Sequence, residues 1–137
     1  MIVVDTHILI WAITDEHHKF SPKVIDVMDK ASRKRELYVS EFSYLEVAML
    51  LAKGRLEFIG SLEDYLEEIE FGLFCKTQKL NVKIIANSVA FDKTINADPA
   101  DRIILATAKF LNATLVTADK NMIKYGKQNG VKVMAAK

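Results

Sequence analysis

Two aspartates stand three positions apart at the start of an otherwise apolar segment, DPADRIILATA, at residues 98–108. Asp98 is a good helix N-cap, and Asp101 completes something close to a capping box. The segment SPKV at residues 21–24 has the same cap-then-proline pattern, but Val24 stands where the other segment has Asp101. Capping therefore accounts well for Asp98 and only loosely for Asp101, which could bind a ligand.

Two further aspartates follow apolar runs that are typical of short buried strands. Asp5 comes directly after Ile-Val-Val at residues 2–4, and Asp119 comes two residues after Thr117 closes a similar run. Each has an ordinary explanation as the N-cap of the helix that follows it. In a parallel α/β sheet, however, ligands bind beyond the carboxyl ends of the strands, where both aspartates would lie.

Glu46 has no cation to pair with along its own helix. Its neighbours three and four positions away are uncharged: Phe42, Ser43, Met49 and Leu50. A carboxylate beside an apolar stripe costs several kcal/mol if it stays ionised and unpaired, so we expect a partner from outside the helix. The acids of a later helix fall away from its apolar stripe, and a solvated helix face explains them: Glu63, Asp64, Glu67, Glu68 and Glu70.

If Asp5, Glu46, Asp101 and Asp119 meet at one sheet edge, electrostatics limits what they can do. Two like charges about 4 Å apart repel by roughly 4 kcal/mol at an effective dielectric constant near 20. Four such groups cannot all stay ionised unless a cation lies among them or some are protonated. All-oxygen ligation suits Mg²⁺ or Mn²⁺, and such sites hydrolyse phosphodiester bonds. The spacing of the four acids along the chain does not by itself show that they converge.

The elements that must position these acids alternate along the chain. We expect short strands at residues 2–4, 37–39, 82–85, 114–117 and 131–133. We expect helices at residues 7–13, 22–33, 42–53, from Ser61 onward, and at 86–91, 99–111 and 120–125. Short Val/Ile/Leu strands alternating with helices predict an α/β fold with a parallel sheet covered on both faces.

The bulk composition excludes several classes of protein. A chain of 137 residues predicts a single domain over residues 1–137. Its formal charge of +1 gives no overall basic field, although a nuclease needs only a local basic rim. Cys75 is the single cysteine, so no intrachain disulfide is possible and a reducing cytoplasmic location is expected. The sequence contains neither a signal peptide nor an apolar run long enough to span a membrane.

Four segments in order resemble the PIN domain and, within it, the VapC-type toxins of bacterial and archaeal toxin–antitoxin pairs. These segments are MIVVDTHILIWA, VSEFSYLEVAMLLAKGRLEF, DPADRIILATA and ATLVTADKNM, and together they span nearly the whole chain. The family's four acids fall on Asp5, Glu46, Asp101 and Asp119. Many relatives have Ser or Asn near position 7, where this chain has His7.

The resemblance implies both a fold and an activity. The implied fold is a three-layer α/β/α sandwich with a central, mainly parallel five-stranded sheet. The implied activity is an Mg²⁺- or Mn²⁺-dependent ribonuclease, with one or two ions held by the four acids, acting on RNA. The resemblance also implies a homodimer and inhibition by a cognate VapB-like antitoxin.

Other residues near the acids have a supporting role or an ordinary structural one. Thr6 and Thr117 could donate hydrogen bonds to ligand carboxylates, and Asp98 could support the site in addition to capping. Lys53 and Arg55 could form a basic rim for RNA, although solvated cations at a helix end are as common. Arg102 could contact phosphate, but pairing with an acid such as Asp98 is favoured. We assign Trp11 to the core or to a dimer contact.

Two alternatives remain open at the level of sequence. The first keeps the fold but assigns it to an RNA-processing nuclease or an inactive scaffold outside toxin–antitoxin systems. The second is a receiver-like module whose Mg²⁺-binding pocket accepts a phosphoryl group. That module needs an aspartate after the third strand, but Asn87 is the first candidate after the strand expected at 82–85, and no carboxylate precedes Asp92. It also leaves Glu46 without a role.

Overall fold

In the computed structural model, which describes residues 1–72, 75–91 and 98–137, five short strands form a single sheet. The strands are β1 (Ile2–Val4), β2 (Leu37–Ser40), β3 (Lys76–Gln78), β4 (Thr114–Thr117) and β5 (Val133–Ala135). Their order in the sheet is β3-β2-β1-β4-β5, and all four pairings are parallel. The expected five-stranded sheet is therefore confirmed, and it is wholly rather than mainly parallel.

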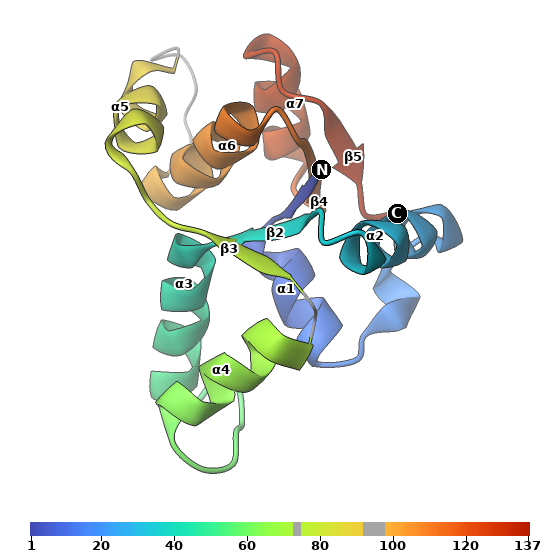
Figure 1. Cartoon of the computed structure of the whole chain (residues 1–137), viewed down its shortest axis with the longest axis vertical. Coiled ribbons are helices and arrows are strands. Elements are labelled where there is room, and N and C mark those ends of the chain that lie inside the picture. The colour runs from blue at the N-terminus through green and yellow to red at the C-terminus, as the bar shows by residue number, and fades with distance from the viewer. Residues whose placement is uncertain (73–74, 92–97) are drawn as a thin grey trace.

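Helices cover both faces of this sheet. They are α1 (Thr6–Ile13), η1 (His17–Lys19), α2 (Pro22–Arg33), α3 (Glu41–Ala52), α4 (Leu62–Gly72), α5 (Val82–Ala90), α6 (Pro99–Leu111) and α7 (Lys120–Gln128). Figure 1 shows α5, α6 and α7 on one side of the sheet and α1 to α4 on the other. Two buried apolar clusters fill the spaces between the layers, one on each face. The fold is thus the α/β/α sandwich that the sequence indicated.

The central strands are buried because both of their faces are covered. The side chains of Val3, Val39, Leu115 and Val116 have no measurable exposure. β1 is hydrogen-bonded to β2 on one side and to β4 on the other, so its carboxyl end lies in the middle of the sheet edge. The residue that follows it, Asp5, is therefore placed at the centre of the edge where ligands bind in parallel sheets.

The expected strand at residues 82–85 is wrong, because this segment is the first part of α5. The Asn81 side chain accepts a hydrogen bond from the backbone N–H of Ile84 at 2.8 Å and so caps the helix. Ile84 is buried, whereas Val82 and Ile85 are exposed, which is the pattern of one helix face rather than of a strand. The third strand lies earlier, at Lys76–Gln78. The three residues between that strand and α5 include no carboxylate either, so the receiver-like alternative gains nothing.

The last strand and the last helix also differ from their expected bounds. β5 begins at Val133 rather than at Val131, and α7 continues to Gln128. A Cβ atom added to Gly126 in α7 would lie 2.2 Å from Val133 Cγ2 and 3.2 Å from the backbone oxygen of Val131. The absence of a side chain at Gly126 therefore allows α7 to pack directly on β5.

The helices are short in comparison with the thickness of a membrane. The longest of them is α6, with 13 residues, whereas a spanning helix needs about 20. Throughout the described ranges, no helix is both long enough and apolar enough to cross a bilayer.

Candidate active site

Asp5 occupies the centre of the sheet edge and is held at both of its carboxylate oxygens. Its side chain is 4% exposed. Oδ1 accepts a hydrogen bond from the backbone N–H of Thr6 at 2.7 Å, and Oδ2 accepts one from the Thr117 hydroxyl at 2.6 Å. Burial raises the pKa of Asp5, although both hydrogen bonds act in the opposite direction. Asp5 therefore caps α1, as its ordinary explanation requires, and also has a carboxylate of fixed orientation.

Glu46 approaches the same point from α3. The Thr6 hydroxyl lies 2.5 Å from Glu46 Oε1 and 2.9 Å from Ser43 Oγ. A hydroxyl has one proton, so Ser43 donates to Thr6 and Thr6 donates to Glu46. Burial raises the pKa of Glu46, and the negative charges of Asp5 and Asp98 raise it further. Thr6 thus links the two carboxylates, because its N–H binds Asp5 and its hydroxyl binds Glu46.

The surroundings of Glu46 differ in part from the expectation. The face of α3 that enters the core is formed by Ser43, Val47 and Leu51, and Met49 on the predicted stripe is 48% exposed. The partner from outside the helix is a hydroxyl, that of Thr6, rather than a cation. The sequence analysis gave Ser43 no role. A serine inside a helix, three residues before an acid, could have indicated one, because serine disfavours helix interiors.

Asp98 and Asp101 divide the two tasks that the sequence assigned to them. Asp98 Oδ1 accepts a hydrogen bond from the backbone N–H of Asp101 at 2.9 Å and caps α6, as predicted. The pKa of Asp101 is raised to about 7, first by burial and then by four neighbouring carboxylates: Asp98, Asp5, Asp119 and Glu46. The structure therefore brings the other predicted acids near enough to Asp101 to raise its pKa.

Asp119 is joined to this group through Thr117. Its backbone N–H donates to the Thr117 hydroxyl oxygen at 3.1 Å, and the same hydroxyl donates to Asp5. Its side chain accepts a hydrogen bond from the backbone N–H of Asn121 at 2.8 Å and caps α7. Asp119 is therefore an N-cap, as its position before a helix predicted. The charge of Asp119 also raises the pKa of Asp5 and Asp101.

The chemistry of these donors suits a divalent cation. Carboxylates that raise one another's pKa are stabilised by a positive charge placed among them, and hard oxygen donors match Mg²⁺ or Mn²⁺. Among the residues that the structure describes, no three His, Cys, Asp or Glu side chains are already grouped closely enough to hold an ion. An ion bound by three of these acids would therefore have to draw their side chains together.

A groove of about 240 Å³ lies beside Glu46 between α1 and α3, and we call it the Glu46 groove. Its walls include Thr6, His7, Ile10, Glu46, Met49, Leu50 and Lys53. His7 is exposed, and its charge lowers the pKa of Asp5 and of Glu46. Lys53 ends α3 about two helical turns beyond Glu46, so the groove leads from the acids to a cation.

The other predicted cations are placed less directly. Arg55 is exposed in the turn after α3 and is not among the residues that line the Glu46 groove. Arg102 is half-buried on the first turn of α6, next to Asp101. The RNA contacts predicted for Arg55 and Arg102 therefore stay predictions.

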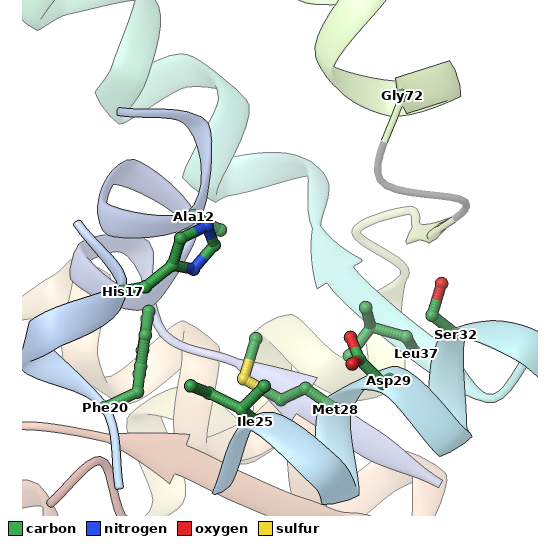
Figure 2. Close-up of a pocket in the computed structure, with 9 residues that line it drawn as sticks. All are labelled: Ala12, His17, Phe20, Ile25, Met28, Asp29, Ser32, Leu37 and Gly72. Atoms are coloured by element: carbon green, nitrogen blue, oxygen red, sulfur yellow. The ribbon is translucent and has the colours of Figure 1, made fainter. Parts of the chain in front are cut away.

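A separate cavity of about 300 Å³ lies at the opposite ends of the strands. Figure 2 shows Phe20, Ile25 and Met28 lining it, with Leu37 at the start of β2. Because the strands are parallel, the start of β2 lies at the edge opposite to Asp5. The cavity contains none of the predicted site residues, and the candidate active site is therefore the acidic edge.

The chain is also similar to known proteins. The model of the PIN domain family matches residues 2–128. Ribonuclease VapC22 of Mycobacterium tuberculosis is 26% identical over 121 residues, which cover 88% of each chain. Two solved structures share the fold. VapBC2 from Rickettsia felis, bound to a DNA fragment from its promoter, has a TM-score of 0.72 and 16% identity, covering 100% of both chains. FitAcB from Neisseria gonorrhoeae has a TM-score of 0.64 and 22% identity, covering 98% of this chain and 96% of the other.

Proposed function

Because this chain belongs to the PIN domain family, we propose that it is a metal-dependent endoribonuclease and the toxin of a toxin–antitoxin pair. The observation that carries the proposal is one hydrogen-bonded network at the carboxyl end of the central strand. In this network Thr117 binds Asp5, and Thr6 binds both Asp5 and Glu46. Such fixed carboxylates at a sheet edge suit phosphodiester hydrolysis.

Four acids have the proposed role of holding one or two Mg²⁺ or Mn²⁺ ions: Asp5, Glu46, Asp101 and Asp119. When bound, the metal supplies an activated water and neutralises the charge that grows on the phosphate and the leaving oxygen. The protein's own contribution is orientation. Thr117 and Thr6 hold the carboxylates of Asp5 and Glu46 in fixed directions, which is the usual task of residues behind metal ligands.

The Glu46 groove gives the RNA strand a path to the acids. Lys53 lines its far end, and its proposed role is to bind a backbone phosphate; sequence-independent contacts of this kind account for much of the affinity for nucleic acid. Arg55 and Arg102 stay predictions for RNA contacts.

A small antitoxin is the proposed protein partner. Two structures that share the fold support it: VapBC2 of Rickettsia felis, and a toxin–antitoxin complex from Klebsiella pneumoniae with a TM-score of 0.59 and 19% identity. A small reading frame beside the gene would favour the toxin, and its absence would favour an RNA-processing nuclease. The cytoplasmic location stays a prediction.

The homodimer also stays a prediction, and one surface is a candidate for it. Val82, Ile85 and Val89 are exposed along one side of α5, close to the exposed Phe110 of α6. An apolar surface of this kind often marks a protein interface. Sedimentation of the purified protein measures the oligomeric state directly.

One experiment tests the proposed activity. The purified protein is incubated with total RNA in Mg²⁺, in Mn²⁺ and in EDTA, and the RNA fragments are sequenced. We expect discrete cleavage with either metal and none in EDTA, because the acids need the cation. Absence of metal-dependent cleavage of any RNA species would instead support an inactive scaffold.

A further inference from the structure

A second groove lies on the other side of the acids, next to Asp119, and three lysines line it. It has a volume of about 210 Å³. We call it the lysine groove, and the residues that matter for the argument are Trp11, Lys19, Lys120, Ile123 and Lys137. They come from α1, η1, α7 and the residues after β5, so the tertiary fold alone brings the three cations together.

Two of the three lysines of this groove are held in place by contacts with the protein, and the third, Lys120, is exposed. Lys19 Nζ lies 4.8 Å from the centre of the Trp11 ring and 3.1 Å from a carboxylate oxygen of Glu16. Lys137 Nζ donates a hydrogen bond to the backbone oxygen of His18 at 3.1 Å. Glu16 offsets the charge of Lys19, but the side chains that line the groove include three lysines and no acid.

Lys120 is placed against the local field of its own helix. It is the first residue of α7, where the helix dipole favours negative charge and disfavours a cation. The carboxylate of Asp119, which caps the same helix, offsets part of this cost, and an anion bound beside Lys120 would offset more of it. The groove therefore has the charge to bind an anionic group next to Asp119.

The shape and walls of the groove indicate which anion. Apart from the lysines, the groove is lined by apolar residues: Trp11, Ile123 and three alanines. Its volume is below the roughly 300–1,000 Å³ of sites that enclose a whole small-molecule ligand, so it suits a part of a longer chain. A phosphate with its ribose has the matching combination of charge and apolar surface. Since Lys19 already lies over the Trp11 ring, the groove offers no free aromatic face for a base.

The sheet order places the two grooves on opposite sides of Asp5. The Glu46 groove involves α3, which follows β2, whereas the lysine groove involves residues that follow β4 and β5. β1 lies between β2 and β4, with Asp5 at its end. A strand that leaves the Glu46 groove and crosses the acids would therefore reach the lysine groove next.

We propose that the lysine groove binds a backbone phosphate of the RNA strand on the side of the cleaved bond that faces Asp119. This inference rests on the proposed ribonuclease function and assigns to Lys19, Lys120 and Lys137 a substrate contact that is independent of base identity. Because such a contact is made equally in the ground state and the transition state, its loss raises KM and leaves kcat nearly unchanged.

The test compares two double variants with the same change in net charge. Lys120→Gln/Lys137→Gln removes two cations from the groove. The control, Lys127→Gln/Lys132→Gln, removes two exposed lysines. Lys127 lies in the last turn of α7 and Lys132 directly before β5, so both lie at the ends of these elements that point away from the acids. Steady-state cleavage of a single-stranded RNA that the unmodified protein cuts is measured at several salt concentrations. Thermal melting verifies folding, and Lys120→Gln alone serves if the double variant melts early.

We expect KM to rise about 5- to 10-fold for the groove variant, with kcat within about two-fold, and to change little for the control pair. The slope of log affinity against log salt should become shallower by about 0.7 for each phosphate contact that is lost. If the unmodified protein cleaves RNA and the two double variants have the same KM and salt dependence, the lysine groove does not bind the substrate. The proposed ribonuclease function would be unaffected by that result. No cleavage by the unmodified protein would overturn both.

Substrates with one neutral linkage identify the phosphate itself. Chimeric oligonucleotides carrying a single methylphosphonate at each position in turn are bound to the protein in the Glu46→Gln background. At one position beside the cleaved bond, we expect the neutral linkage to weaken RNA binding by the protein with an intact groove. In the groove variant the same linkage should cause no further loss of affinity, as expected in a double-mutant cycle of two groups that interact. If the groove variant still bound RNA but no longer bound an antitoxin, the result would contradict the proposal and indicate that the groove binds a protein partner.

Discussion

The molecule carries two groups of acidic side chains whose environments are opposite. The first is the acidic centre, which consists of Asp5, Glu46, Asp101 and Asp119 at the carboxyl edge of the sheet. The second is the acidic face of α4, which consists of Glu63, Asp64, Glu67 and Glu68. All four side chains on α4 are exposed, whereas Asp5 is buried and the other three are half-buried. Water screens the acids of α4 from one another, but the acidic centre has to be compensated within the protein.

The difference shows that the number of charges says little about function and that their environment says much. In the acidic centre, burial and neighbouring carboxylates raise the pKa of Asp5, Glu46 and Asp101. Repulsion of this kind destabilises the fold at neutral pH, and perturbed carboxyls in one place are typical of functional sites. Glu70 marks the boundary on α4, because it is half-buried and accepts a hydrogen bond from Thr77, so it is not part of the solvated face that was expected.

The largest expected difference between the two groups is catalytic. Asp5→Asn or Glu46→Gln should lower RNA cleavage by about 10³-fold or more, because each removes a charge at the proposed metal site. Glu67→Gln makes the same chemical change on α4 and should leave the rate unchanged. Initial rates on one RNA substrate, with circular dichroism as a folding control, give the answer. Full activity of either variant of the acidic centre would exclude the assigned site.

The response of stability to metal should differ next. Mg²⁺ at 100 times its dissociation constant should stabilise the folded protein by about 2.7 kcal/mol, because it binds the folded acids and not the unfolded chain. Asp101→Asn should reduce this gain, and Glu67→Gln should retain it. Thermal melting in EDTA and in increasing Mg²⁺ measures the effect. An equal shift in all three proteins would indicate that the ion binds elsewhere.

The dependence of stability on pH without metal should follow the acidic centre as well. A carboxyl whose pKa is raised on folding holds its proton better in the folded state, so its stabilising effect is complete below the unfolded pKa and is lost as pH rises through the folded pKa. For Asp101 this window runs from about pH 4 to about pH 7. Stability measured in urea with EDTA should fall across that window. Asp101→Asn should flatten the curve, and a curve as steep as that of the unmodified protein would contradict the raised pKa.

The smallest expected effect separates Asp98 from Asp101. Asp98→Ala removes an N-cap and should destabilise the protein at neutral pH by less than the usual cost of about 1 kcal/mol, because the loss of its charge also relieves repulsion on Asp101. Asp101→Asn should instead stabilise the metal-free protein, because it relieves repulsion. Denaturant midpoints in EDTA compare the two variants. Changes of the same sign in both would mean that the two aspartates do not have separate tasks.

The parts of the fold that were predicted correctly are those whose local pattern has one interpretation. β1 is a continuous apolar run, and β4 has Leu115 and Val116 between two threonines; both strands are buried and were predicted correctly. β3 is Lys-Thr-Gln at the edge of the sheet, and three polar residues carry no strand signal. The segment at 82–85 is rich in β-branched residues, which favoured a strand, whereas the cap at Asn81 that indicates a helix was overlooked.

The candidate site divides in the same way. Position after a strand was enough to predict Asp5 and Asp119, and the lack of a partner along its helix was enough to single out Glu46. The hydroxyl chain from Ser43 through Thr6 depends on how α1 packs on α3, and no local pattern encodes that contact. The lysine groove depends on four parts of the chain that are distant in sequence: α1, η1, α7 and the residues after β5. The position of these acids at the sheet edge was therefore predictable from local patterns, and the contacts made by long-range packing were not.

The close packing at Gly126 offers a way to control this protein from a distance. A methyl group there would meet Val133 and the backbone of residue 131, so α7 would have to move away from β5. The start of the same helix carries the cap residue Asp119, which shares Thr117 with Asp5. We therefore expect Gly126→Ala to give a temperature-sensitive protein. It should fold and be active at low temperature and lose its activity at higher temperature, with all the acids unchanged.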